Sequence, residues 1–108
     1  MKNENIFSNL EKYKDFKSII YYQNNRYNNI DYNTLVKKSS KIKNRIEKNK
    51  LVILLCDNSI ENIIYYVGLI RNNNKIILAD SNSNNDHIDI LIKNYKPSYI
   101  LGKNNIVN

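Results

Sequence analysis

The stretch that decides the fold is LVILLCDNSIENIIYYVGLIRNNNKIILAD, residues 51–80. It opens and closes with short apolar runs, Leu51 to Cys56 and Lys75 to Ala79, whose Ile, Leu and Val content is typical of strands covered on both faces of a parallel sheet. Between the two runs, apolar residues recur at helical spacing: Ile60, Ile63, Ile64, Val67 and Ile70. The stretch therefore predicts a strand, a helix and a second strand in one βαβ unit.

The start of this central helix carries a capping pattern. With Asn58 as the N-cap, Glu61 occupies the third helical position, where its carboxylate can reach back to the cap and lie near the positive end of the helix dipole. Tyr65, Tyr66 and Leu69 widen the apolar stripe, so we expect a helix buried on most sides. Gly68 is expected to allow close packing of this helix on the sheet.

Upstream of residue 51, the sequence predicts a helix, a hairpin and a second helix. The first helix covers Asn5 to Lys14. The strands Ile19 to Gln23 and Arg26 to Ile30 follow, joined by Asn24-Asn25, because asparagine tolerates the left-handed conformations of a tight hairpin turn. Asp31 is the expected N-cap of the next helix, which ends near Lys48 to Asn49 and has one face formed by Tyr32, Leu35, Val36, Ser39, Ile42 and Ile46.

Downstream of the βαβ unit, the sequence predicts a polar loop, a last helix and a short strand. The loop covers Asp80 to Asn85, and the helix face repeats at Ile88, Leu91, Ile92 and Tyr95. Pro97 stops the helix, and Ser98 to Leu101 form the strand, before Gly102 and a polar tail.

These elements define an α/β fold class. Residues 1–108 are expected to form a single α/β domain, in which an N-terminal helix and a β-hairpin precede a β-α-β-α-β unit. Its short parallel sheet is sandwiched by helices, with right-handed crossovers between the strands. A chain of 108 residues has room for one hydrophobic core, and no linker or internal repeat divides it.

The formal net charge of +7 raises the question of an anionic partner. Seven basic residues concentrate on the helix before residue 51, but no aromatic side chains are interleaved on its polar face to stack bases. This distribution favours a solvated basic face over nucleic-acid binding, and a weak contact with an anionic surface or nucleic acid remains the alternative. The seven residues are Lys37, Lys38, Lys41, Lys43, Arg45, Lys48 and Lys50.

Cys56 is the single cysteine, so an intramolecular disulfide is impossible and a reducing cytoplasmic location is expected. We expect Cys56 in the core, although its place just before a helix start leaves a reactive thiol as the alternative. No early segment joins a basic start to a long apolar core, so no secretory signal is expected, and no apolar run approaches the length of a membrane span.

A few polar residues could in principle form a site. Asp57 and Asp80 each follow a strand at its carboxyl end, where α/β sheets commonly bind ligands, but both are also good turn and cap residues. His87 lies beside Asp86 and Asp89, but neighbours one and two positions apart on a helix point in different directions, which disfavours a metal site. The nine tyrosines favour packing roles. The sequence therefore assigns no catalytic, cofactor-binding or metal-ligating residue.

From residue 18 to 101, the order of elements resembles the beginning of the adenylate-forming (AMP-binding) enzymes, which include acyl-CoA synthetases, amino-acid adenylation domains and luciferases. Five segments carry the resemblance: IIYYQNNRYNNIDYNTL (19–35), VILLCDNSIE (52–61), YYVGLIRNNNKIILAD (65–80), YKP (95–97) and YIL (99–101). In that family a hairpin leads into a Thr-Tyr-x-Glu-Leu helix start, and a later strand ends in an Asn-Ser-x-Glu cap. Here Asp31 replaces the usual Thr or Ser, Thr34 replaces Glu, and Asn73 or Asn74 replaces Gly.

The resemblance implies an N-terminal fragment or truncated relative of an AMP-dependent ligase, which would join a carboxylate to ATP as acyl-AMP. ATP and Mg²⁺ are implied for a full-length relative, but no cofactor is expected for this chain, because the family's phosphate loop and catalytic Lys belong to later segments. With Gly68 and Gly102 as its two glycines, the chain has no loop that could wrap a phosphate.

This polypeptide alone is therefore expected to be inactive, with the missing downstream segment or a second copy of itself as its partner. A stand-alone protein-interaction module is the first alternative, and a weak basic nucleic-acid binder is the second.

Overall fold

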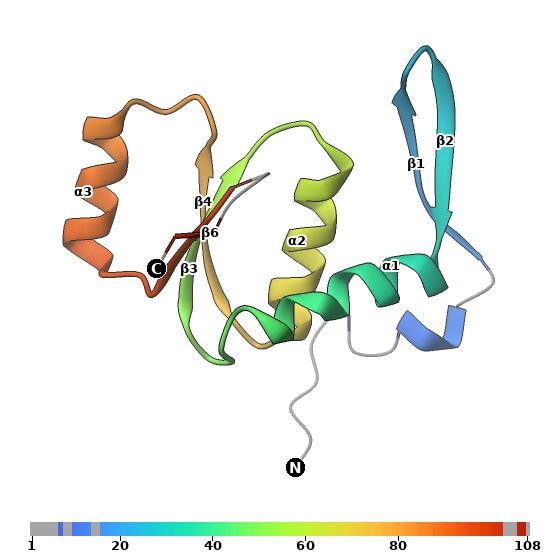
Figure 1. The fold of residues 1–108 in the computed structure, drawn as a ribbon, viewed down its shortest axis with the longest axis horizontal. Helices are drawn as coiled ribbons and strands as arrows, with labels where there is room; N and C mark the ends of the chain where they lie inside the picture. Colours follow the sequence, from blue (N-terminus) through green and yellow to red (C-terminus); the bar gives the residue numbers. More distant parts are fainter. Residues whose placement is uncertain (1–6, 8–9, 14–15, 103–105, 108) are drawn as a thin grey trace.

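The computed structural model describes residues 7, 10–13, 16–102 and 106–107 (Figure 1). In chain order, the elements are the 3-10 helix η1 (Leu10–Tyr13), β1 (Lys17–Gln23), β2 (Arg26–Asp31), α1 (Tyr32–Ser40), the 3-10 helix η2 (Lys41–Asn44), β3 (Leu51–Cys56), α2 (Ile60–Arg71), β4 (Lys75–Asp80), α3 (Asn85–Tyr95), β5 (Tyr99–Leu101) and β6 (Ile106–Val107). The predicted order of hairpin, helix and β-α-β-α-β is confirmed.

The four-stranded sheet has the order β4-β3-β5-β6. Strand β3 pairs in parallel with both β4 and β5, while β6 is antiparallel to β5. Helices α2 and α3 lie on opposite sides of this sheet (Figure 1). The parallel sheet between helices is therefore as predicted, whereas β6, a strand of two residues, was not expected from the polar tail.

The hairpin is a separate two-stranded sheet that stands apart from the four-stranded one (Figure 1). Its turn residues Asn24 and Asn25 have φ values of 56° and 62°, which is the left-handed conformation expected of them. In the register of β1 and β2, Ile19 lies opposite Ile30 on the face that packs against α1 and α2. Tyr22 lies opposite Tyr27 on the other face. The predicted hairpin is therefore confirmed in both its strands and its turn.

The core consists of two clusters. The larger one lies between the sheet and the helices α2 and η2, and its members include Ile46, Val52, Leu54 and Leu69, all at most 2% exposed. The smaller one joins the hairpin to α1 and α2 through Ile30, Leu35, Ile64 and Val67. Helix α2 contributes to both clusters and so ties the two sheets together.

Two predicted helix starts have different outcomes. Asp31 is the N-cap of α1, and its Oδ1 accepts a 2.8 Å hydrogen bond from the Thr34 N–H, which lowers the pKa of the Asp31 carboxyl. For α2, the prediction of Asn58 as the N-cap was wrong by one residue. Ser59 is the cap, and its side chain accepts from the Asn62 N–H. Glu61 thus lies at the second helical position, out of register for the capping pair.

The end of the second helix was predicted too late. The α-helix α1 stops at Ser40, and the chain tightens into η2, which ends at Asn44. Ile42 and Ile46 are still buried after the change to a 3-10 helix, at 5% and 2% exposure, so the predicted apolar face is kept.

Gly68 has a different neighbour from the expected one. A Cβ built on Gly68 would lie 2.6 Å from the Ser39 carbonyl oxygen of α1 and 3.0 Å from the Ile42 side chain. The glycine therefore allows close approach between two helices, and the prediction of helix-sheet contact was wrong.

The terminal helices bury less than expected. Within the described residues, the predicted helix from Asn5 to Lys14 is represented by the 3-10 helix η1 and by Phe7, which lies in a turn, and residues 5–6, 8–9 and 14 lie outside them. Helix α3 has no fully buried residue, and Tyr95 is 58% exposed. Helix α2 leaves Ile63 and Tyr66 at 44% and 38% exposure, so one of its faces is open.

Candidate functional site

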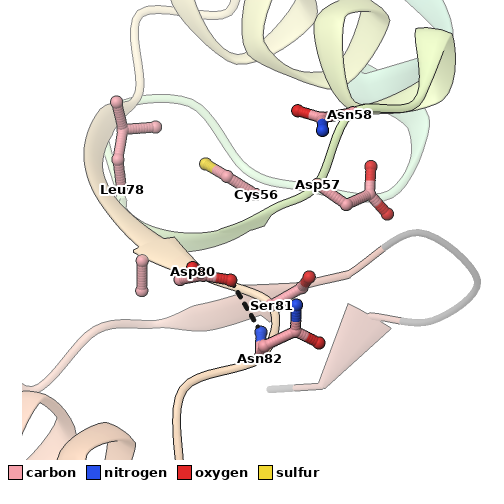
Figure 2. Close-up of a pocket in the computed structure, with 8 residues that line it drawn as sticks. Cys56, Asp57, Asn58, Leu78, Asp80, Ser81 and Asn82 are labelled. Atoms are coloured by element: carbon pink, nitrogen blue, oxygen red, sulfur yellow. Dashed lines mark hydrogen bonds between the residues drawn. The ribbon is translucent and has the colours of Figure 1, made fainter.

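The sheet topology produces a crevice at the carboxyl ends of β3 and β4. After β3 the chain turns to α2 on one side of the sheet, and after β4 it turns to α3 on the other side (Figure 1). Open α/β sheets commonly bind ligands where two such connections diverge. The crevice has a volume of about 490 Å³ and is lined by Cys56, Asp57, Asn58, Leu78, Ala79, Asp80, Ser81 and Asn82 (Figure 2).

Both carboxylates of this crevice close turns. Asp57 Oδ1 accepts hydrogen bonds from the N–H of Ser59, at 2.8 Å, and from the Ser59 hydroxyl. Asp80 Oδ1 accepts from the Asn82 N–H, also at 2.8 Å. Figure 2 shows the Asp57 side chain pointing away from Asp80. The turn and cap roles expected of these two residues are confirmed, and both carboxylates already accept backbone donors.

Cys56 precedes Asp57 in the chain, is the register partner of Asp80 on β4, and is half-buried. Its thiol donates to the Leu54 carbonyl oxygen at 3.4 Å. Burial raises the pKa of the Cys56 thiol, and the negative charges of Asp57 and Asp80 raise it further, outweighing the lowering effect of a backbone hydrogen bond from Ala79. Because the thiolate is the nucleophilic form, this environment disfavours the reactive alternative.

His87, Asp86 and Asp89 are all exposed on α3. Among the residues that the structure describes, no group of three His, Cys, Asp or Glu side chains could hold a metal ion.

The seven basic residues are exposed, as expected, but they do not lie on one helix: Lys37 and Lys38 belong to α1, Lys41 and Lys43 belong to η2, and Arg45, Lys48 and Lys50 follow η2. The structure adds an aromatic side chain that helix periodicity could not reveal. Tyr65 of α2 joins Lys38, Lys41 and Arg45 in lining one hollow. The ring belongs to a neighbouring helix and so does not appear on the polar face of the predicted basic helix itself.

Most of the tyrosines in the described residues have packing roles. Tyr21 and Tyr32 pack against the smaller core cluster, while Tyr22 and Tyr27 form an edge-to-face pair with ring centroids 5.1 Å apart.

None of the helices in the described part of the chain has the length and hydrophobicity needed to cross a membrane.

The arrangement of hairpin, helices and sheet defines the class. It is the arrangement found in part of the N-terminal subdomain of adenylate-forming enzymes, and the resemblance stated from the sequence is confirmed at the level of the fold. No protein-family model matches the chain, and no curated protein matches its sequence.

Solved structures provide the particular matches. The N-terminal subdomain of NpsA from Klebsiella oxytoca in complex with anthranilyl-AMSN aligns with 92% of this chain at 20% identity and a TM-score of 0.75. The same share aligns with NpsA in complex with 3-hydroxyanthranilyl-AMSN, at 20% identity and a TM-score of 0.74. A fatty acid AMP ligase from Legionella pneumophila matches 80% of the chain at 16% identity and a TM-score of 0.60.

The chain spans a minor part of each match: 27% and 21% of the two NpsA chains and 16% of the ligase chain. At these identities, the matches establish the fold alone.

Proposed function

We propose that residues 1–108 form the first structural layer of an adenylate-forming ligase, an enzyme that activates a carboxylate with ATP as an acyl-adenylate. The observation that carries the proposal is the alignment of 92% of the chain with the NpsA subdomain at a TM-score of 0.75. That subdomain is solved with anthranilyl-AMSN, so the fold that this chain resembles is one that holds such a ligand.

In this proposal, the chain supplies a scaffold and no reacting group. Two observations support the scaffold role. The carboxylates in the crevice already accept hydrogen bonds from backbone N–H groups of their own turns. The chain also has two glycines, which are too few to build a phosphate loop. ATP, Mg²⁺ and the acyl and thiol substrates, CoA among them, would be bound by other segments. A cytoplasmic location belongs to the same proposal, supported by the single cysteine.

Two measurements test the proposal. Calorimetric titration of residues 1–108 with Mg²⁺-ATP is expected to give no binding heat, and clear Mg²⁺-dependent binding would contradict the scaffold role. In the second measurement, residues 1–108 replace the matching segment of the NpsA N-terminal subdomain. This chimera is expected to fold, as judged by circular dichroism, and to bind anthranilyl-AMSN.

The control for the chimera is the NpsA subdomain rebuilt in the same way from its own segment. Failure of the chimera to fold or to bind, beside a control that does both, would contradict the assignment to the adenylate-forming class.

A second candidate function is a protein-interaction module. The observation that favours it is the free edge of β4, which is the last strand of its sheet in the described part of the chain and leaves Leu78 at 57% exposure. Unpaired edges bind other chains by strand addition. Sedimentation equilibrium of the chain and of its Leu78→Lys variant tests this function, because a lysine on an edge strand opposes strand addition.

A further inference from the structure

Nearly all of the net charge comes from one short segment. Residues 32–50 contain seven Lys or Arg and one acidic residue, Glu47, which gives +6 of the formal +7 of the whole chain. Glu47 pairs with Lys50 at 3.9 Å. Within the described residues, no carboxylate lies at ion-pair distance from Lys38, Lys41 or Arg45. The segment is therefore a concentrated and largely uncompensated positive surface.

The first of two hollows on this surface combines charge with an apolar wall. It has a volume of about 200 Å³ and is lined by Lys38, Lys41, Ile42, Arg45 and Tyr65. The three cations are exposed, whereas Tyr65 is half-buried and packs against the larger core cluster. A ligand that fits here carries negative charge and a flat apolar group in the same unit.

The second hollow lies on the other flank of the same helical segment. It is also about 200 Å³ in volume and is lined by Ser39, Ser40, Lys43, Lys48, Gly68, Arg71 and Asn72. Arg71 is held in place by an ion pair with Glu11 and a 2.7 Å hydrogen bond to the Phe7 carbonyl oxygen. A helix with its side chains is about 10–12 Å across, so a polymer can reach both hollows and a single small anion cannot.

We propose that the surface formed by these two hollows binds single-stranded nucleic acid without sequence preference. Phosphates would contact the cations of both hollows, and a base would lie against Tyr65 and Ile42. Nucleic acid fits better than an acidic polypeptide because a nucleotide joins a phosphate to a flat ring, as the first hollow requires. This activity goes beyond the proposed scaffold role and does not depend on it.

The test uses fluorescence anisotropy with labelled oligouridine and the whole chain at increasing salt. Each neutralised phosphate on a single strand adds about −0.7 to the slope of log K against log salt, so the five cations other than Arg71 predict a slope of about −3.5. The double variant Lys38→Ala/Lys41→Ala is expected to bind more weakly and to reduce that slope by about 1.4. The matched control Lys75→Ala/Lys93→Ala removes the same charge from β4 and α3 and is expected to keep a larger share of the affinity.

Further arms separate nucleic acid from other polyanions. Tyr65→Leu is expected to lose about fivefold or more in affinity for oligouridine and little for an abasic strand of equal length, while Tyr65→Phe retains both. Urea unfolding of each variant shows whether the fold is kept. Equal binding of polyglutamate, equal losses in the two double variants, or no binding of oligouridine at low salt would each overturn the proposal.

Discussion

Gly68 shows how a single residue sets the distance between two helices. In an exposed helix interior, glycine is about 1 kcal/mol less favourable than alanine, so Gly→Ala usually stabilises a helix. Here the added methyl group would meet the Ser39 carbonyl oxygen at 2.6 Å, and that oxygen belongs to the backbone of α1. Because a backbone cannot rotate away as a side chain does, the two helices would have to separate.

We therefore expect Gly68→Ala to lower the free energy of unfolding by about 1–3 kcal/mol, the usual cost of overpacking. Urea denaturation followed by circular dichroism measures this change. The control is Asn94→Ala on the exposed side of α3, where the expected change is close to zero or slightly stabilising. An unchanged or increased stability of Gly68→Ala would show that α1 and α2 are not so closely packed.

Two buried amides join neighbouring connections between elements. Asn72 Nδ2 donates to the Ile46 carbonyl oxygen at 3.0 Å and to Asn74 Oδ1 at 2.8 Å. Asn74 Nδ2 donates to the carbonyl oxygens of Glu47 and Lys50, at 2.8 Å and 3.2 Å. Both asparagines are 6% exposed. This amide pair fastens the connection before β3 to the connection before β4.

Asn72→Ala removes the side-chain donor to the carbonyl oxygen of buried Ile46, and Asn74→Ala removes the one to the Glu47 carbonyl oxygen, whereas the Lys50 carbonyl oxygen keeps the Lys75 N–H. We expect Asn72→Ala and Asn74→Ala each to cost about 1–3 kcal/mol of unfolding free energy. Because the two side chains bond to each other, the double variant should cost less than the sum of the single variants. Urea denaturation of all three, with Asn94→Ala as the control, measures this coupling, and strict additivity would contradict it.

Periodicity predicted the long elements because their burial pattern is local. The strands β3 and β4 and the helix α2 appear in the sequence as apolar runs and a 3.6-residue repeat. The change from α1 to η2 has no such signal, since Lys41 to Asn44 contains no helix breaker and the tightening places Ile42 and Ile46 in the core. Strand β6 is too short to have a period.

The candidate sites also differ in whether the sequence alone could locate them. The crevice at the carboxyl ends of β3 and β4 could be located from where the apolar runs stop, so Asp57 and Asp80 were found in advance. The hollow around Tyr65 could not be located, because it depends on which flank of α1 contacts α2. The pair of buried amides, Asn72 and Asn74, was not predicted, because asparagine near a helix end usually has a turn role.

At the scale of the whole molecule, one edge of the four-stranded sheet is open in the described part of the chain. The N–H groups of Lys75 and Ser81 donate to Lys50 and Cys56, so alternate residues of β4 bond to β3. The backbone groups of Ile76 and Leu78 therefore point to the outer edge. Such an edge favours pairing with another strand.

We expect the 108-residue chain to self-associate, and Leu78→Lys to shift it towards the monomer, because a lysine on an edge strand opposes strand addition. Sedimentation equilibrium measures the distribution. The matched control is Ile90→Lys on α3, since Ile90 has nearly the same exposure, 56% against 57%, but lies away from the edge. A native chain that stays monomeric at all concentrations would count against both self-association and the interaction-module function.

The turns of this protein have a consequence for its gene. Among the described residues with positive φ, four are asparagines, at positions 24, 25, 49 and 73, where glycine is the usual choice. Glycine codons begin with two guanines, whereas asparagine codons begin with two adenines. A gene that encodes asparagine in place of glycine at these turns contains less guanine. The conformational cost is small, because asparagine tolerates the left-handed region best after glycine. The fold thus permits an adenine-rich coding sequence without losing its turns.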